Sequence, residues 1–256
     1  MTKTILITSG KGGVGKTTIT AYLAYILSEH GKKVCIVDAD IGLKNMDTLL
    51  GIENRVLFDG EDVLAGRCTL EKALVQDKRI EHLYLLTLKR SLKCSTFAMK
   101  DFVSLMILLR NRFDYILVDS PAGIESGFQF GVEICDEVLL VTQLEATALQ
   151  DADRVVALIQ QQNKPVKIIY NRVSPPLIKR GIQMDLNDAH EYLCTPLGGI
   201  VYESEELLHT SNKGMLPRLK KGMVYQCFFT IMQRLEDIEY PLPYYIPKSL
   251  LSKLRG

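Results

Sequence analysis

The stretch that decides the fold is ITSGKGGVGKTTIT, residues 7–20. Within it, Gly10, Gly15, Lys16 and Thr17 match the pattern GxxxxGK[ST], in which glycines let backbone N–H groups curl around an anion. An apolar run precedes the stretch and helical spacing follows it, which is the strand-loop-helix context that the pattern requires. A chance match in a glycine-rich turn is the alternative, and the context disfavours it. We therefore predict a phosphate-binding loop.

Each side chain of this loop has an expected task. Lys16 reaches the β and γ phosphates, and the hydroxyl of Thr17 is offered to magnesium. The N-terminus of the following helix adds positive potential. We expect ATP and Mg²⁺ as the bound species. The predicted nucleotide contacts in the loop are Gly10, Lys11, Gly12, Gly13, Val14, Gly15, Lys16, Thr17 and Thr18.

Apolar runs that are continuous rather than alternating recur along the chain. Such runs are typical of strands covered on both faces, as in a parallel sheet flanked by helices. The runs are 3–9, 33–40, 82–88, 114–120, 137–143, 166–172 and 197–203, with helix-like segments such as 97–111 and 146–162 between them. We predict an α/β fold with a doubly wound, mostly parallel sheet, the fold of P-loop NTPases.

Length and composition favour one large domain. The chain has 256 residues, of which 47% are hydrophobic, enough for a sizeable core. Only the end, YPLPYYIPKSLLSKLRG (240–256), changes character, because its three prolines stop regular structure. We predict an ATPase domain over residues 1–240 and a proline-rich tail with a short amphipathic helix over 241–256.

Charge and cysteine content exclude several classes of protein. Thirty-one basic and thirty acidic residues give a net charge of +1, so no field of the whole chain attracts nucleic acid or lipid. The six cysteines lie far apart without a CxxC pair, which indicates reduced thiols, most of them buried, in a cytosolic protein. The sequence also lacks the pattern of a standard secretion signal and any apolar run long enough to span a bilayer.

Acidic residues follow two of the predicted strands. Asp119 ends the run YILVD and is the expected strand-end carboxylate for magnesium, with an ordinary turn aspartate as the alternative. Asp38 and Asp40 end another run. An aspartate with a pKa of about 3.9 is a poor base at neutral pH, so we assign Asp40 to orienting the attacking water and Asp38 to supporting magnesium. Helix capping is the alternative for both.

Lys11 is a second lysine in a loop that already has Lys16. The backbone donors and Lys16 occupy the side of the loop that faces the phosphates, so we expect Lys11 to point outward. A cation inserted from a facing subunit would stabilise charge on the γ-phosphate in the transition state, as an arginine finger does. A solvated loop lysine is the alternative.

These motifs resemble those of the ParA/MinD family of deviant Walker A ATPases, and of its MinD branch in particular. The segments that carry the resemblance are KGGVGKTT (11–18), DADIGLKNMD (38–47), LLGIENRVLFD (49–59), ALVQDKRIEHLYLL (73–86), DSPAGIESG (119–127) and YNRV (170–173). The resemblance implies an ATPase that dimerises face to face around two nucleotides, with Lys11 of each subunit touching the phosphates in the other.

The resemblance also implies where the adenine is held. Asn171 and Arg172, in YNRV, match the segment that binds the base, and Asn171 has the donor and acceptor that a purine edge needs. Asn171 as the cap of a strand end is the alternative. The chain departs from the family pattern at 202–204, where Tyr-Glu-Ser replaces a Pro-Glu-Asp-like turn that supplies a second adenine contact.

The segment KSLLSKLR, residues 248–255, places three leucines on one side of a short helix and basic residues on the other. Eight residues are too few to form a helix alone in water, so we expect order only on a surface. One copy would bind an anionic membrane weakly, and two copies on a dimer far better. Docking on the protein itself or a frayed tail are the alternatives. The predicted membrane residues are Leu250, Leu251, Lys253 and Leu254.

The resemblance implies a membrane-associated ATPase that helps to place the site of cell or plastid division. Its expected partners are a second copy, an anionic membrane, a division inhibitor and an ATPase activator, with no specific nucleic acid. Its expected location is the cytoplasm or plastid stroma, on the inner face of the membrane. A flagellar-number regulator of the same group, a ParA-type partitioning ATPase and a scaffold that binds ATP without turnover are the alternatives. Unsuitable cysteine spacing disfavours an iron–sulfur carrier.

Overall fold

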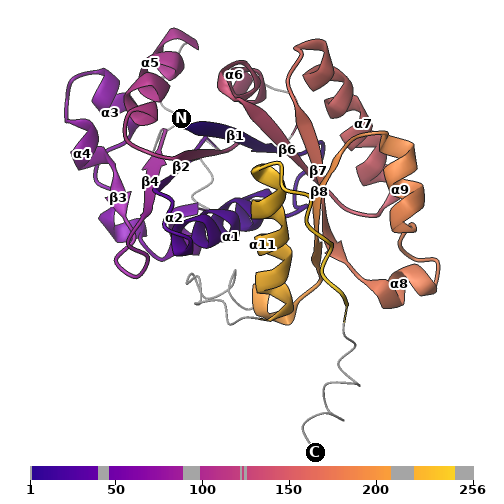
Figure 1. Cartoon of the computed structure of the whole chain (residues 1–256). Helices are drawn as coiled ribbons and strands as arrows, with labels where there is room; N and C mark the ends of the chain where they lie inside the picture. Colours follow the sequence, from indigo (N-terminus) through magenta and orange to yellow (C-terminus); the bar gives the residue numbers. More distant parts are fainter. Residues whose placement is uncertain are drawn as a thin grey trace, which may run out of the picture.

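One sheet of eight strands, in the order β3-β4-β2-β5-β1-β6-β7-β8, forms the centre of the molecule (Figure 1). The computed structural model of the chain describes residues 2–39, 46–88, 99–121, 123, 126–208 and 222–245. Neighbouring strands are parallel except β3, which is antiparallel to β4. The strands are β1 Lys3–Thr8, β2 Val34–Asp38, β3 Val75–Gln76, β4 Leu83–Thr87, β5 Tyr115–Asp119, β6 Glu137–Thr142, β7 Val166–Val173 and β8 Leu197–Tyr202. The predicted fold class is confirmed.

Helices cover both faces of the sheet. Figure 1 shows α1 and α11 on one face and α5, α6 and α7 on the other. The long helices are α1 Lys16–Glu29, α5 Met99–Arg110, α6 Ser126–Ile134, α7 Ala146–Gln161, α9 Leu186–Leu193 and α11 Met223–Leu235. Short helical turns are α2 Met46–Leu50, η1 Glu53–Arg55, α3 Gly60–Leu64, α4 Leu70–Ala73 and α8 Pro175–Lys179. The layers explain why the strand sequences are apolar throughout rather than alternating.

The register of the central strands aligns their ends. Asp38 of β2 lies opposite Asp119 of β5, and Asp119 lies opposite Ile7 of β1. We call the edge at which these parallel strands end the carboxyl edge, and the edge at which they begin the amino edge. In open α/β sheets, ligands bind outside the carboxyl ends of the strands.

The core is closed between the sheet and its helices. Ile5, Leu6 and Ile7 of β1 are fully buried, and Tyr22 of α1 stacks on Phe228 of α11 with ring centroids 5.2 Å apart. Burial of such side chains contributes roughly 1.5 to 3 kcal/mol each. The two helices are thereby fixed to each other and to the sheet.

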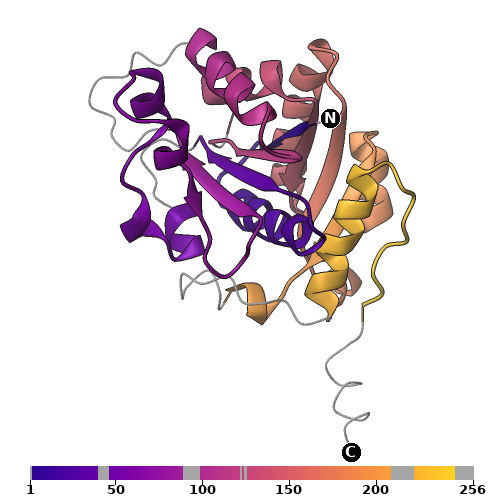
Figure 2. The ribbon, with the colours of Figure 1, turned by 60° about the vertical axis from the view of Figure 1, so that its left-hand side comes forward.

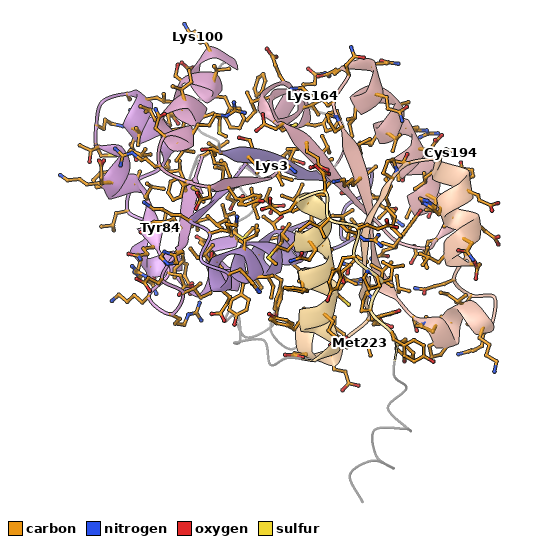
Figure 3. The ribbon with its side chains drawn as sticks, viewed as in Figure 1. Lys3, Tyr84, Lys100, Lys164, Cys194 and Met223 are labelled. Atoms are coloured by element: carbon orange, nitrogen blue, oxygen red, sulfur yellow. The ribbon has the colours of Figure 1, made fainter. Side chains whose placement is uncertain are left out.

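The chain after α11 runs back along the fold toward the carboxyl edge. Figure 2 shows residues 236–245 beside α11, and Figure 3 places Lys3 near one end of that helix and Met223 at the other. Arg234 donates two hydrogen bonds to the carbonyl of Tyr240, and Thr230 donates one to the carbonyl of Pro241. The described part of the tail is therefore docked on the domain.

Two elements differ from the sequence-based expectations. β3 has only two residues and no apolar run, so periodicity did not reveal it. α11 also lay outside the predicted helices, although its apolar face packs on β8 and α1. Cys35, Cys135 and Cys227 are buried, whereas Cys194 is exposed; none of the described cysteines is in a disulfide. In the ranges described above, no helix combines the length and hydropathy needed to cross a membrane.

Candidate nucleotide-binding site

The glycine loop joins the end of β1 to the start of α1 and is shaped by two close approaches. A Cβ on Gly10 would lie 2.5 Å from the backbone of Asp151 in α7, so only glycine lets the loop pack there. Gly15 has φ +100°, which favours glycine, and a Cβ on it would lie 2.3 Å from Nδ2 of Asn171. The two glycines of the sequence pattern thus have separate structural reasons.

The N-terminus of α1 is open to an anion. Its N-cap residue, Gly15, offers no side-chain cap, and its first turn has no acidic residue. Lys16 opens the helix with its side chain largely buried, and Thr17 and Thr18 follow, half-buried. An uncapped helix N-terminus with a lysine and hydroxyl groups favours phosphate, because N–H groups and the helix dipole act together.

Lys11 has a different environment from Lys16. Its side chain is 46% exposed, and its Nζ lies 3.7 Å from Oε2 of Glu145, just before α7. Its backbone is held more firmly, because the hydroxyl of Ser9 donates to the carbonyl of Lys11 at 2.7 Å. A half-exposed ion pair of this length contributes at most about 1 kcal/mol, so the side chain of Lys11 is only loosely retained.

Two carboxylates lie side by side at the carboxyl edge. Asp38 and Asp119 are both buried, and the N–H of Ala39 donates to the carbonyl of Asp119 at 3.0 Å. The hydroxyl of Thr20 lies 3.4 Å from Oδ1 of Asp119 and 3.0 Å from the carbonyl of Lys16. Thr20 therefore links the magnesium-candidate carboxylate to the first turn of α1.

The oxygen atoms of this edge fit magnesium. Mg²⁺ prefers hydroxyl, carboxylate, phosphate and water oxygens and usually takes only one or two carboxylates. The predicted ligands Thr17, Asp38 and Asp119 have oxygen atoms of these kinds. Within the described ranges, no group of three or more His, Cys, Asp or Glu is arranged to hold a metal ion by itself. Asp40, predicted to orient water, lies outside the described residues.

A hollow of about 490 Å³ opens beside the glycine loop. Its walls are Gly15, Thr18, Asn171, Arg172, Tyr202, Glu203, Ser204, Leu207 and Leu208. Asn171 is buried, and its Nδ2 donates to the carbonyl of Val14 at 2.7 Å. One of its amide hydrogens thus serves the loop itself, so the residue ties the hollow to the glycine loop.

Arg172 lies in a bulge of β7. Its φ is +55°, which is uncommon for a residue other than glycine. Gln183 stabilises the bulge from both sides: its Nε2 donates to the carbonyl of Arg172 at 2.9 Å, and its Oε1 accepts from the N–H of Ser174 at 2.8 Å. The bulge interrupts the pairing of β7 with β8 where the hollow lies.

Several wall residues were not among the predicted contacts. Tyr202 is placed by the pairing of β8 with β7, which no short motif records, and Leu207 and Leu208 lie a few residues beyond that strand. The Tyr-Glu-Ser turn at 202–204, noted as a departure, was the only local signal. Burial raises the pKa of Tyr202, so its hydroxyl is neutral at physiological pH.

The fold and this edge define a P-loop nucleotide-binding protein. A family model described as an AAA domain matches residues 2–170. The septum site-determining protein MinD of Synechocystis is 38% identical over 260 residues, covering 100% of this chain and 98% of that protein. The chain therefore belongs to the MinD family of septum site-determining ATPases. Its predicted family and its enzyme class, an ATPase, are confirmed.

Solved structures agree with this assignment. A MinC:MinD cell division protein complex from Aquifex aeolicus has a chain with a TM-score of 0.86 and 40% identity, covering 95% of this chain and 100% of that one. MinD from Pyrococcus horikoshii, complexed with Mg-ADP, has a TM-score of 0.80 and 28% identity, covering 92% of this chain and 96% of that one. The family relationship thus spans nearly the whole chain.

Proposed function

We propose that the chain is an ATP-dependent switch for placing the division site, which dimerises on ATP, associates with an anionic membrane and recruits a division inhibitor. The observation that carries the proposal is the pairing of two unlike lysines in one loop: a largely buried Lys16 and a half-exposed Lys11. The first is positioned for its own subunit's phosphates, whereas the ammonium group of the second makes, among the described residues, one ion pair of 3.7 Å with Glu145.

ATP and Mg²⁺ are the proposed ligands. Lys16 neutralises phosphate charge, and the backbone of Gly10–Thr18 donates to phosphate oxygens. Thr17, Asp38 and Asp119 hold Mg²⁺, which supplies charge neutralisation at the phosphates. Asn171 and Arg172 hold the base, and Asp40 orients the attacking water. The complex of the Pyrococcus horikoshii relative with Mg-ADP supports this ligand pair.

Dimerisation would complete the site. Lys11 leaves Glu145 and reaches the phosphates of the facing subunit, where it stabilises transition-state charge. The loss of a contact worth at most about 1 kcal/mol is a small cost for this movement. Hydrolysis removes the γ-phosphate that Lys11 contacts and separates the subunits.

The membrane and protein partners are the finer part of the proposal. Residues 1–240 act as the ATPase domain, and 241–256 act as the tail, with Leu250, Leu251, Lys253 and Leu254 at the membrane. These four residues lie outside the described ones. The Aquifex aeolicus complex of a MinD with MinC supports a division inhibitor as a partner. The proposed location is the cytoplasm or plastid stroma, at the inner face of the membrane.

A liposome sedimentation experiment tests the switch. The full chain should pellet with anionic vesicles in ATP but not in ADP, and truncation after Tyr245 should abolish pelleting. The Lys11→Ala variant should bind nucleotide yet lose ATP-dependent pelleting and stimulated turnover. The exposed Lys100 provides a matched control, because Lys100→Ala removes a similar charge on α5. Equal pelleting of the Lys11→Ala variant would remove the trans role of Lys11.

A further inference from the structure

Tyr202 borders two hollows of the molecule. It ends β8 and lines the hollow beside the glycine loop, together with Glu203 and Leu207. It also lines a second hollow of about 1240 Å³ with Tyr245 and Val224. The residue is 9% exposed and forms a wall common to both hollows.

The tail is attached to Tyr202 by two different contacts. The hydroxyl of Tyr202 donates to the carbonyl of Pro243 at 2.9 Å, in a buried position. Its ring lies 5.2 Å from the ring of Tyr245, centroid to centroid, at an angle of 55°. Tilted aromatic pairs at this distance are favourable beyond the area that they bury. Tyr244, between the two, is 84% exposed and has no comparable contact.

The hydrogen bond from Tyr202 is the last of three side-chain hydrogen bonds that α11 and β8 donate to carbonyls of the tail. The carbonyls of Tyr240, Pro241 and Pro243 each accept a side-chain hydrogen bond, from Arg234, Thr230 and Tyr202 in turn. The first two donors belong to α11. Only the third donor also borders the hollow beside the glycine loop. Tyr202 therefore connects that hollow directly to the tail.

We propose that Tyr202 couples occupancy of this hollow by a nucleobase to the position of residues 243–245. The inference rests on the proposed function in one respect, that the base of the nucleotide fills the hollow. A base that displaces solvent beside the ring restricts its motion, and the restriction passes to Pro243 and Tyr245 through the contacts above. Because such coupling is reciprocal, a docked tail strengthens nucleotide binding by the same factor.

This coupling differs from the dimer switch in what it requires. It acts within one subunit and depends on the base rather than the γ-phosphate. ADP should therefore produce it as well as ATP, without a membrane or a second copy. Inorganic pyrophosphate, which has phosphates but no base, should not.

The chain contains no tryptophan, so Tyr245→Trp introduces a single fluorescent reporter at the end of the docked tail. Titration of this variant with Mg-ADP should change its tryptophan emission and raise its anisotropy, at the concentrations at which calorimetry detects ADP binding. Mg-pyrophosphate should leave both signals unchanged. Tyr192→Trp is the matched control, because Tyr192 is a half-exposed tyrosine on α9, which packs against α7.

Two changes at Tyr202 test the route. Tyr202→Phe in the Tyr245→Trp background removes the hydrogen bond to Pro243 but keeps the ring, and should reduce the ADP-linked change by at least half. Tyr202→Leu should abolish it. In the reverse direction, Tyr245→Ala in the otherwise unchanged chain should weaken ADP binding by about 5-fold, the lower end of typical coupling between sites.

The outcomes separate this inference from the proposed function. A tryptophan that stays silent while calorimetry shows ADP binding would overturn the coupling and leave the ATP site intact. The same signal with pyrophosphate, or in the Tyr202→Leu background, would also overturn it. Failure of ADP to bind at all would overturn both. A structural role of Tyr202 alone would lower stability without making the tryptophan respond to the base.

Discussion

The two edges of the sheet are both rich in charged side chains, but they use them differently. At the amino edge, the carboxylate of Glu137 is buried. It forms ion pairs with Nζ of Lys3 at 2.8 Å and with Nζ of Lys167 at 2.9 Å. Lys167 also pairs with Asp237 at 2.8 Å and donates to the carbonyl of Arg234 near the end of α11. At the carboxyl edge, the ion pair of Lys11 is longer and half-exposed. The charged side chains of the amino edge pair tightly with one another, whereas Lys11 at the carboxyl edge is held by a weak ion pair.

The two edges show how structural charge can be distinguished from charge that is able to change partners. A network with short contacts on every member holds elements together, here α11 against the strand starts. A cation with one long contact near a glycine loop and a hollow is free to change partners at small cost. The same substitution, glutamate to glutamine, can therefore be applied at both edges to compare them.

The largest effect is expected from Lys16→Met at the carboxyl edge. This change keeps the apolar stem of a largely buried side chain but removes the ammonium group. ATP turnover should fall by about 100-fold or more, because a preorganised charge at the phosphates is lost. The free energy of unfolding, measured in urea, should change by less than about 1 kcal/mol. Turnover above one tenth of the original would contradict this role.

Glu137→Gln should lower the stability of the protein but leave its ATP turnover nearly unchanged, the opposite of Lys16→Met. It leaves Lys3 and Lys167 near a neutral amide, and breaking a buried ion pair costs about 3 kcal/mol in the free energy of unfolding. ATP turnover of the folded protein should stay within about twofold, since the amino edge is remote from the glycine loop. Glu133→Gln, at an exposed position of α6, is the control and should change stability by less than about 0.5 kcal/mol. Equal destabilisation by both changes would refute the comparison.

The pH dependence of stability sharpens the comparison further. The hydrogen bond and charge of Lys167 hold the pKa of Asp237 below its ordinary value of 3.8. A carboxyl whose pKa is lowered by folding stabilises the protein above its unfolded pKa, and this contribution is lost as the pH falls through the lowered value. The contribution is thus present at neutral pH and disappears in acid, below about pH 3.8.

The variant Asp237→Asn isolates this contribution. Asp237 has φ +56°, a region that asparagine also tolerates, so the backbone should be kept. Urea unfolding between pH 3 and 7 should show a shallower loss of stability in acid for the variant than for the original chain. Identical acid profiles would mean that Asp237 contributes nothing through this pair.

Glu145→Gln should have the smallest effect on stability. The ion pair with Lys11 is 3.7 Å long and half-exposed, so the free energy of unfolding should change by less than about 0.5 kcal/mol. The loss in free energy of unfolding on changing glutamate to glutamine should then be several-fold larger at the amino edge (Glu137) than at the carboxyl edge (Glu145). A loss above about 1 kcal/mol would show that the carboxyl edge is as closed as the amino edge.

The sequence predicted the central part of the fold because the physical signal is local there. Each inner strand is buried on both faces and therefore reads as a continuous apolar run, and the glycine loop marks the junction of β1 and α1. β3 was missed because two residues carry no periodicity. Tyr202 was not among the predicted contacts of the hollow, because its place in the wall depends on which strands pair.

The candidate site also contains residues that a local sequence pattern marks and residues that only the tertiary structure brings in. The phosphate contacts lie on one loop, so their positions follow from a single motif. Asp38 and Asp119 are 81 residues apart in sequence, yet each ends an apolar run, and the parallel register brings them together. Gln183 carries no such local mark, since its role comes from a bulge in β7. Tyr202 was marked only as a departure from the family pattern, and its contact with the tail depends on tertiary structure.

The path of the tail has a practical consequence for labelling the molecule. Because residues 236–245 return to the carboxyl edge, a bulky label attached at the exposed Tyr244 would lie close to the hollow beside the glycine loop. Thr2, in contrast, is held at the amino edge by hydrogen bonds to the carbonyls of Arg110 and Phe113. Reporters for imaging or surface immobilisation are therefore better placed at the N-terminus.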